Sequence, residues 1–161
     1  MLLKEAVLRF LEYCELDRYL SQRTVRMYGY YLQFFEAWML QQKPDGKFLV
    51  FSRYDNPFLQ LTSEIEGMNI SVKQVKGNKD VIAATLKGFE TGKTKVLLLN
   101  SLEAGAGMNI TAATDVILLH AMTHEEEKQI LGRAYRMGRK EPLSVVRLLH
   151  PEELQHAHSS T

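Results

Sequence analysis

The sequence predicts an α/β domain in three layers, with a parallel sheet between helices on both faces. Between residues 47 and 150, short apolar runs of strand length alternate with stretches of helical periodicity, and this alternation is typical of a parallel sheet. Two of the runs, 96–99 and 116–119, are continuously apolar. Such runs are expected of strands whose two faces are both covered by helices.

The first forty residues show a different pattern, which predicts a helical hairpin ahead of the sheet. Apolar residues recur at helical spacing over 3–14 and 25–39, and Ser21 is placed to cap the second helix. The polar linker 41–47 then separates the hairpin from the alternating region. We therefore expect a helical hairpin over 1–42, an α/β lobe over 43–155 and a loose polar tail over 156–161.

Each element of the alternating region carries its own signal. Strands are expected at 48–51, 70–75, 96–99, 116–119 and 144–149. A helical stretch to about residue 66 follows the first strand. Asn78 is placed to cap the next helix, and Thr123 with Glu126 forms a capping box for the last one. Gly92 and Gly138 are placed to end these two helices.

Composition limits the functions open to the chain. It carries 20 Lys and Arg against 19 Asp and Glu, a formal net charge of +1, so any basic surface that meets nucleic acid must be local. One cysteine, Cys14, supports neither a disulfide framework nor a cysteine metal site. No apolar run is long enough to cross a membrane, and the N-terminus does not form a signal peptide. We expect an intracellular protein of a reducing compartment, with no metal site and no membrane contact.

The segment 129–136, Gln-Ile-Leu-Gly-Arg-Ala-Tyr-Arg, is the most informative part of the chain. On a helix, Gln129, Arg133 and Arg136 would lie within about 60° of one another. The opposite side would carry Ile130, Leu131, Ala134 and Met137. Two guanidinium groups that project together favour a phosphate ligand. From the residues alone, the alternative is a solvated basic helix face.

Loops that follow the strands of a parallel sheet are the usual place for ligands. Ser52 and Arg53 follow the first strand, and Gly77 and Asn78 follow the second. The run 100–109, Asn-Ser-Leu-Glu-Ala-Gly-Ala-Gly-Met-Asn, follows the third, and its small residues would let backbone N–H groups approach a phosphate or sugar closely. Taken singly, each loop is also explained as a turn that needs a positive φ.

In this order and at these spacings, the segments resemble the C-terminal RecA-like lobe of superfamily two helicases and translocases, most closely the Swi/Snf-like branch. The resemblance covers about 47–150: residues 48–53 resemble motif IV, 96–113 motif V and 129–138 motif VI, which is the most specific. The loop 104–107 is one residue shorter than is usual in that branch. Features between 115 and 143 also resemble translocase-like proteins of large DNA viruses and phages.

The resemblance implies the C-terminal motor lobe of an ATP-dependent nucleic-acid translocase or helicase. It implies that Arg133 and Arg136 are arginine fingers, which reach the γ-phosphate of ATP held by a partner lobe. The nucleotide-binding residues that it implies are Gln129, Gly132, Gly107 and Asn109. The implied contacts to nucleic acid, by the Swi/Snf resemblance duplex DNA, are made by Ser52, Arg53, Ser101, Ala104 and Gly105.

The sequence contains no P-loop and no Asp-Glu strand end of the kind that holds magnesium. We therefore expect the isolated chain to be inactive, with ATP and Mg²⁺ bound mainly by an N-terminal RecA-like ATPase lobe. That lobe would belong to a longer enzyme or to a partner protein. The alternative is a non-catalytic RecA-like module that docks DNA or protein. Since such a module has no reason to keep Gln129 and both arginines, the motor interpretation is favoured.

The N-terminal hairpin, about 3–39, resembles the first helices of the core-binding domain of tyrosine recombinases. The resemblance rests on a Leu-Ser-x-x-Thr-x-x-x-Tyr pattern over residues 20–28. It implies a helix that lies against DNA, and hence a recombinase-like DNA-binding module as a further alternative. Strand cleavage is not implied, because no recombinase catalytic domain follows. The alternative is a hairpin that packs on the lobe as its helical lead-in.

Overall fold

The computed structural model describes residues 45–53, 56–100, 108–119, 122–135, 137 and 139–147. The chain divides into two units between Asp45 and Gly46, and the elements below belong to the second. The expected hairpin over 1–42 and the tail over 156–161 lie outside the described residues. So do the following residues of the expected sites: Ser101, Ala104, Gly105, Gly107, Arg136 and Gly138. None of the described helices is long and apolar enough to cross a membrane.

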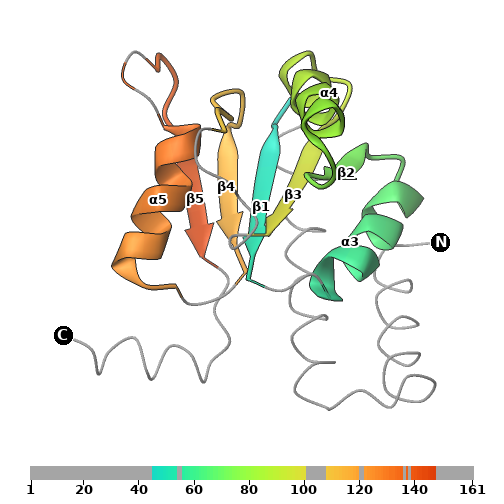
Figure 1. Ribbon diagram of the computed structural model, residues 1–161, viewed down its shortest axis with the longest axis horizontal. Helices are drawn as coiled ribbons and strands as arrows, with labels where there is room; N and C mark the ends of the chain where they lie inside the picture. Colours follow the sequence, from blue (N-terminus) through green and yellow to red (C-terminus); the bar gives the residue numbers. More distant parts are fainter. Residues whose placement is uncertain are drawn as a thin grey trace. The chain divides into compact units, whose positions relative to one another are not determined.

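The described strands form a five-stranded sheet in the order β2-β3-β1-β4-β5 (Figure 1). Their bounds are β1 Phe48–Ser52, β2 Val72–Gln74, β3 Val96–Asn100, β4 Asp115–Leu118 and β5 Ser144–Arg147. Every pairing is parallel. The register sets Ser52 at the end of β1 beside Asn100 at the end of β3. The predicted parallel sheet is therefore confirmed, with a shorter second strand than expected.

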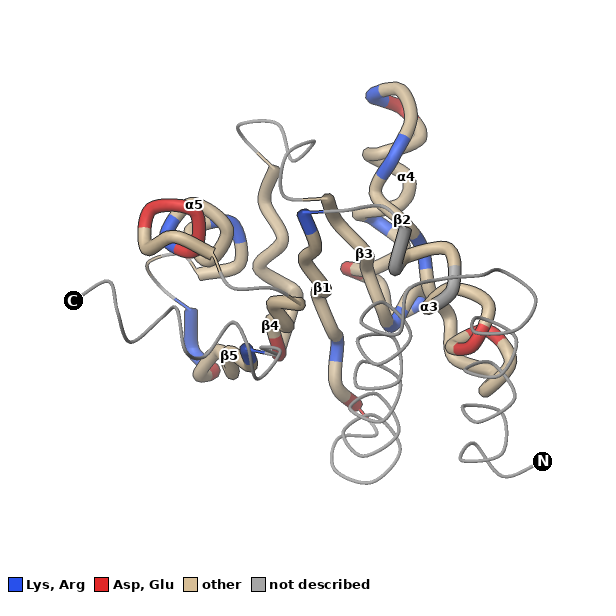
Figure 2. Tube along the Cα trace, turned by 90° about the horizontal axis from the view of Figure 1, so that it is seen from below, with Lys and Arg blue, Asp and Glu red and all other residues tan. Residues whose placement is uncertain are grey.

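Three described helices cover the sheet on both faces: α3 Asn56–Gly67, α4 Lys79–Glu90 and α5 His124–Ala134. Helices α4 and α5 lie on one face and α3 lies on the other (Figures 1 and 2). The predicted three-layer arrangement is confirmed, and it matches the RecA-like lobe that the resemblance implied.

The core explains why the central strands read as continuous apolar runs. Every residue of β1, β3 and β4 is buried. Alternate residues of these strands, Leu97 and Leu99 among them, pack with Phe89 of α4 and Ile130 of α5. Burying a side chain of this size stabilises the fold by about 1.5–3 kcal/mol. The edge strand β5 is only partly buried.

The helix starts were predicted correctly. The side chain of Asn78 accepts a hydrogen bond from the Val81 amide at 3.0 Å and so caps α4. Gly92 follows the end of α4 with a φ of +85°, which is strained for other residues. The capping box of α5 is also present: Thr123 Oγ1 accepts from Glu126 N at 3.3 Å, and a Glu126 carboxylate oxygen accepts from Thr123 N at 2.8 Å.

The predicted end of the last helix was wrong. Helix α5 ends at Ala134, and Tyr135 has extended backbone angles, φ −103° and ψ 114°, so the helix does not run on toward Gly138. Met137 is fully exposed rather than on the buried side. The cause is tertiary: Ile110 N donates to the Arg133 carbonyl at 3.0 Å, and the Arg139 guanidinium donates to the Ala134 carbonyl at 3.3 Å.

Candidate functional site

The carboxyl edge of the sheet sets side by side the ends of the two strands that precede two of the expected loops. Ser52 and Asn100 end neighbouring strands in register, and both are buried. Arg53 follows the first of them, and the run of small residues from Ser101 follows the second. The two strands end at the same edge, as expected, because neighbouring parallel strands end on the same side.

Arg53 is held at this edge by an ion pair with helix α5. Its Nη2 donates to both carboxylate oxygens of Glu126, at 3.0 and 2.8 Å. Glu126 is also the capping-box residue, and its pKa is lowered first by the hydrogen bond from the Thr123 backbone and further by the hydrogen bond and charge of Arg53. The pair therefore joins the loop after β1 to the first turn of α5. Sequence reasoning missed the pair, because its members are 73 residues apart.

The other end of α5 carries the residues expected at the nucleotide. Gln129 and Gly132 are exposed and Arg133 is half-buried. Because burial removes water from the guanidinium, the pKa of Arg133 lies below its ordinary value. A Cβ added at Gly132 would meet no atom within 4 Å, so the space over Gly132 is open.

Asn109 lies beside the end of α5, because the next residue, Ile110, bonds to the Arg133 carbonyl. From there the chain runs to the amino edge of the sheet, where Thr114 N and the Thr114 hydroxyl bond to the backbone of Lys47 ahead of β1. Helix α5 therefore runs from the carboxyl edge to the amino edge.

The candidate residues consequently form two groups at opposite ends of α5. Ser52 and Arg53 lie by its first turn, and Asn109 and Arg133 by its last. An 11-residue helix separates the groups by about 16 Å. Only the first group therefore lies at the carboxyl edge, where ligands of a parallel sheet were expected. Helical geometry puts Gln129 one turn before Arg133 on the same face.

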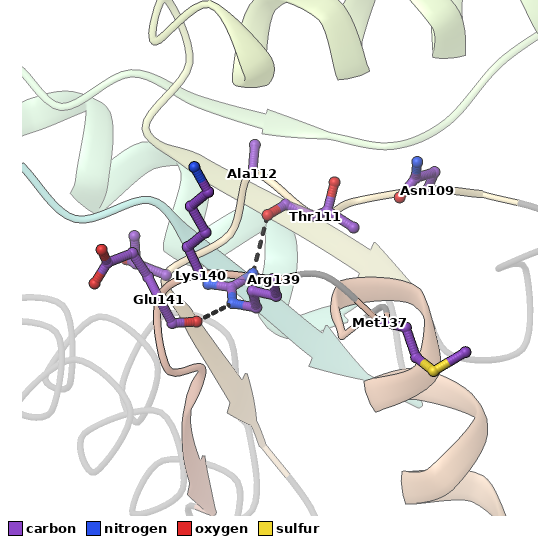
Figure 3. Close-up of a pocket in the computed structure, with 8 residues that line it drawn as sticks. Asn109, Thr111, Ala112, Met137, Arg139, Lys140 and Glu141 are labelled. Atoms are coloured by element: carbon purple, nitrogen blue, oxygen red, sulfur yellow. Dashed lines mark hydrogen bonds between the residues drawn. The ribbon is translucent and has the colours of Figure 1, made fainter.

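A cavity of about 520 Å³ opens next to Asn109 at this second end. Figure 3 shows Arg139 among the lining residues, with hydrogen bonds to the backbone of Thr111 and Glu141. The lining residues are Asn109, Thr111, Ala112, Thr114, Met137, Arg139, Lys140 and Glu141. Sequence reasoning gave Arg139 no role, and no local signal marks it, because its carbonyl partners lie up to 28 residues away.

Within the described ranges, no group of three or more His, Cys, Asp or Glu side chains could hold a metal ion. The side-chain donors toward the end of α5 are the guanidinium of Arg133 and the exposed amide of Gln129. These groups fit the phosphate end of a nucleotide rather than its magnesium ion.

The chain belongs to the helicase conserved C-terminal domain family, whose model matches residues 30–138. A protein of Acanthamoeba polyphaga mimivirus whose name describes a helicase is 37% identical over 73% of this chain. An Arabidopsis thaliana protein named as a SWI/SNF-related regulator of chromatin is 30% identical over 68% of it. The matched regions are 14% of the mimivirus protein and 13% of the Arabidopsis protein.

The fold is also similar to a solved Swi/Snf structure. The Sulfolobus solfataricus SWI2/SNF2 ATPase core, in complex with double-stranded DNA, superposes with a TM-score of 0.62 at 20% identity. The superposition covers 83% of this chain and 30% of that one. The chain is thus a C-terminal RecA-like lobe of the superfamily two type, with relatives in the Swi/Snf-like branch, as its motifs implied.

Proposed function

We propose that this chain is the C-terminal motor lobe of an ATP-dependent nucleic-acid translocase. The observation that carries the proposal is the hydrogen bond between Ile110 N and the Arg133 carbonyl, at 3.0 Å. It holds Asn109, from the motif V-like segment, beside Arg133 of the motif VI-like helix. A cation and an amide held together in this way can meet the phosphates of a nucleotide on a facing lobe.

Arg133 acts in this proposal as an arginine finger. Transfer of the γ-phosphoryl group spreads negative charge over its oxygens, and a planar guanidinium that arrives on lobe closure stabilises that charge. The partly desolvated charge of Arg133 gains more from such a partner than a fully hydrated one. Arg136 is the second finger, Gln129 senses the nucleotide, and Gly132 and Gly107 let its phosphates approach the backbone.

ATP and magnesium are held mainly by the partner lobe, an N-terminal RecA-like ATPase lobe with a P-loop. When bound there, the magnesium ion offsets charge on the β- and γ-phosphates. This chain contributes positive charge from the opposite side of the cleft, and lobe closure brings that charge into place.

Nucleic acid binds at the carboxyl edge, at the other end of α5. Ser52, which is buried, and Arg53, which is half-buried, are the described contacts at this edge. We propose Ser101, Ala104 and Gly105, which follow β3 in the sequence, as further contacts to the backbone of the strand. We propose duplex DNA as the substrate, because the motifs are Swi/Snf-like and the similar Sulfolobus core was solved with double-stranded DNA. In this arrangement α5 links the nucleic-acid surface to the arginine finger.

The domain organisation proposed with this function is a helical hairpin over 1–42, the lobe over 43–155 and a polar tail. The hairpin is the helical lead-in to the lobe, and this accords with a family match that begins at residue 30.

The proposal is tested by measuring ATP turnover by the isolated chain and by a protein that joins it to a P-loop lobe. The isolated chain should show no ATPase above background and bind ATP with a dissociation constant in the millimolar range, about −4 kcal/mol. The protein that joins this lobe to a P-loop lobe should hydrolyse ATP, and duplex DNA should stimulate it. A joined protein whose turnover equals that of the P-loop lobe alone, with and without DNA, would show that this chain is a docking module.

A further inference from the structure

The Arg139 side chain donates hydrogen bonds to backbone carbonyls of three separate segments of the lobe. Its Nε donates to Glu141 O at 2.7 Å, and its Nη1 donates to Thr111 O at 2.9 Å and to Ala134 O at 3.3 Å. Its Nη2 makes a short hydrogen bond to Ala113 O. One side chain therefore joins the segment after Asn109, the last turn of α5 and the turn that leads to β5.

The same geometry excludes Arg139 as a main ligand for an anion in the cavity. A guanidinium has five N–H groups, and four of them already point at carbonyl oxygens. At most one remains for a phosphate, whereas tight recognition by arginine uses two parallel bonds. The positive charge instead offsets the partial negative charge of the converging carbonyls, including the C-terminal end of the α5 dipole.

Three of the carbonyls that Arg139 binds lie close in sequence to the two partners of the bond between Ile110 and Arg133. Thr111 O and Ala113 O follow Ile110, and Ala134 O follows Arg133. Arg139 thus clamps both partners of the bond that sets the backbone of Arg133 beside Asn109. Without the clamp, the end of α5, where helices commonly fray, would lose its bond to the Arg139 side chain.

We propose that Arg139 is a positioning residue for the arginine finger Arg133, acting through the carbonyls of Thr111, Ala113 and Ala134. This inference rests on the proposed function, because it assigns Arg139 to the turnover in which Arg133 acts. Arg139 itself touches no substrate. Its loss moves Arg133 away from the geometry of the transition state, where a shift of about 1 Å can cost on the order of 100-fold in rate.

Two substitutions separate positioning from folding. Arg139→Lys keeps the charge, but the three N–H groups of one ammonium nitrogen cannot reach carbonyls that face the planar guanidinium from several sides. Arg139→Ala removes charge and bonds together. Lys140→Ala serves as the charge control, because Lys140 is the exposed neighbour in the same cavity wall. Leu86→Ala is the stability control, because Leu86 packs on the core from α4.

The first measurement is amide hydrogen exchange in the full chain, which needs no ATPase. In Arg139→Lys, the Ile110 and Tyr135 amides, which bond to the Arg133 and Leu131 carbonyls, should exchange about tenfold faster or more. The amides of β3 should keep the wild-type rate. In Leu86→Ala and Lys140→Ala, the ratio of the exchange rates at Ile110 and Tyr135 to those of β3 should stay as in the wild type. Wild-type protection at Ile110 and Tyr135 in both Arg139 variants would overturn the proposal.

The second measurement is ATP turnover in the joined two-lobe protein. Arg139→Lys should lower kcat about tenfold or more with the KM for ATP unchanged. Lys140→Ala and Leu86→Ala should keep wild-type kcat at a temperature where they are folded. Wild-type kcat in Arg139→Lys would also overturn the proposal. If Arg133→Ala kept wild-type turnover, the proposed function of Arg133 would fail instead, while exchange at Ile110 would still show whether Arg139 is the clamp.

Discussion

The amide of Ile110 donates to the carbonyl of Arg133, and this main-chain bond of 3.0 Å directly links the two segments most suggestive of nucleotide chemistry. It does not depend on either side chain. Substitutions of the Arg133 side chain should therefore leave the backbone geometry in place. Function and folding can be tested separately at this position.

The ion pair at the other end of α5 should make stability depend on pH. The pKa of Glu126 is lowered in the folded protein from its ordinary value of 4.5, so the folded state binds fewer protons than the unfolded state. Glu126 therefore stabilises the fold above pH 4.5, and this stabilisation is lost as the pH falls through the lowered pKa. Urea unfolding at a series of acidic pH values should show a shallower loss in Glu126→Gln than in the wild type.

Glu125→Gln is the matched control, because Glu125 is exposed on the same turn. Its pH dependence should follow that of the wild type. An equal slope in Glu126→Gln and the wild type would show that the pair with Arg53 and the capping box contribute nothing measurable.

Removing the Leu97 side chain should destabilise the lobe strongly. Leu97 lies in β3, an interior strand of the sheet, and is fully buried, so Leu97→Ala should cost about 2–5 kcal/mol through lost burial and a cavity. Leu59 is 72% exposed on α3, and Leu59→Ala should change stability by less than about 0.5 kcal/mol. Chemical denaturation measures both. Similar costs for the two variants would contradict the assigned core.

Two glycines should respond in opposite ways to alanine. Gly92 has a φ of +85°, so Gly92→Ala should cost about 1 kcal/mol or more, although the space around it is open. Gly67 ends α3 with no atom within 4 Å of an added Cβ. Gly67→Ala should raise stability by about 0.5 kcal/mol, because alanine favours the helix. Thermal melts of both variants measure these changes in stability. A Gly92→Ala variant that is more stable than the wild type would refute the assigned turn.

The elements that the sequence predicted well are those set by local forces or by burial on both sides. Strands 48–51 and 96–99 were recognisable because every position is apolar and buried. The caps at Asn78 and Thr123 were recognisable because their bonds join residues three apart. The end of α5 was not recognisable from the sequence, since Ile110 and Arg139 stop the helix through bonds that no local pattern encodes.

The sequence motifs named the candidate residues, and the structure adds how these residues are laid out. Arg133 and Asn109 were singled out from their motifs, and the structure sets them side by side. Arg133 and Asn109 are separated from Arg53 by the length of α5. This separation depends on the direction in which the helix crosses the sheet, which the motifs do not encode. The ion pair of Arg53 with Glu126 depends on the same feature.

Arg53 should contribute to DNA binding through phosphate. If it neutralises one phosphate, Arg53→Gln should weaken binding of the chain to duplex DNA and reduce the slope of log K against log salt by about 0.9. Lys93, exposed beyond the end of α4, is the control, and Lys93→Gln should keep the wild-type slope. Fluorescence anisotropy across a salt series measures both. An unchanged slope in Arg53→Gln would mean that Arg53 serves only its bond to Glu126.

The most direct test of the motor assignment is the turnover of Arg133→Ala in the protein that joins this lobe to a P-loop lobe. An arginine finger acts on charge that develops in the transition state, so kcat should fall about 1,000-fold, near 4 kcal/mol, with the KM for ATP nearly unchanged. Arg133→Lys should not restore it, and Lys128→Ala, an exposed lysine of the same helix, should keep wild-type turnover. Wild-type kcat in Arg133→Ala would contradict the assignment and leave α5 with a solvated basic face.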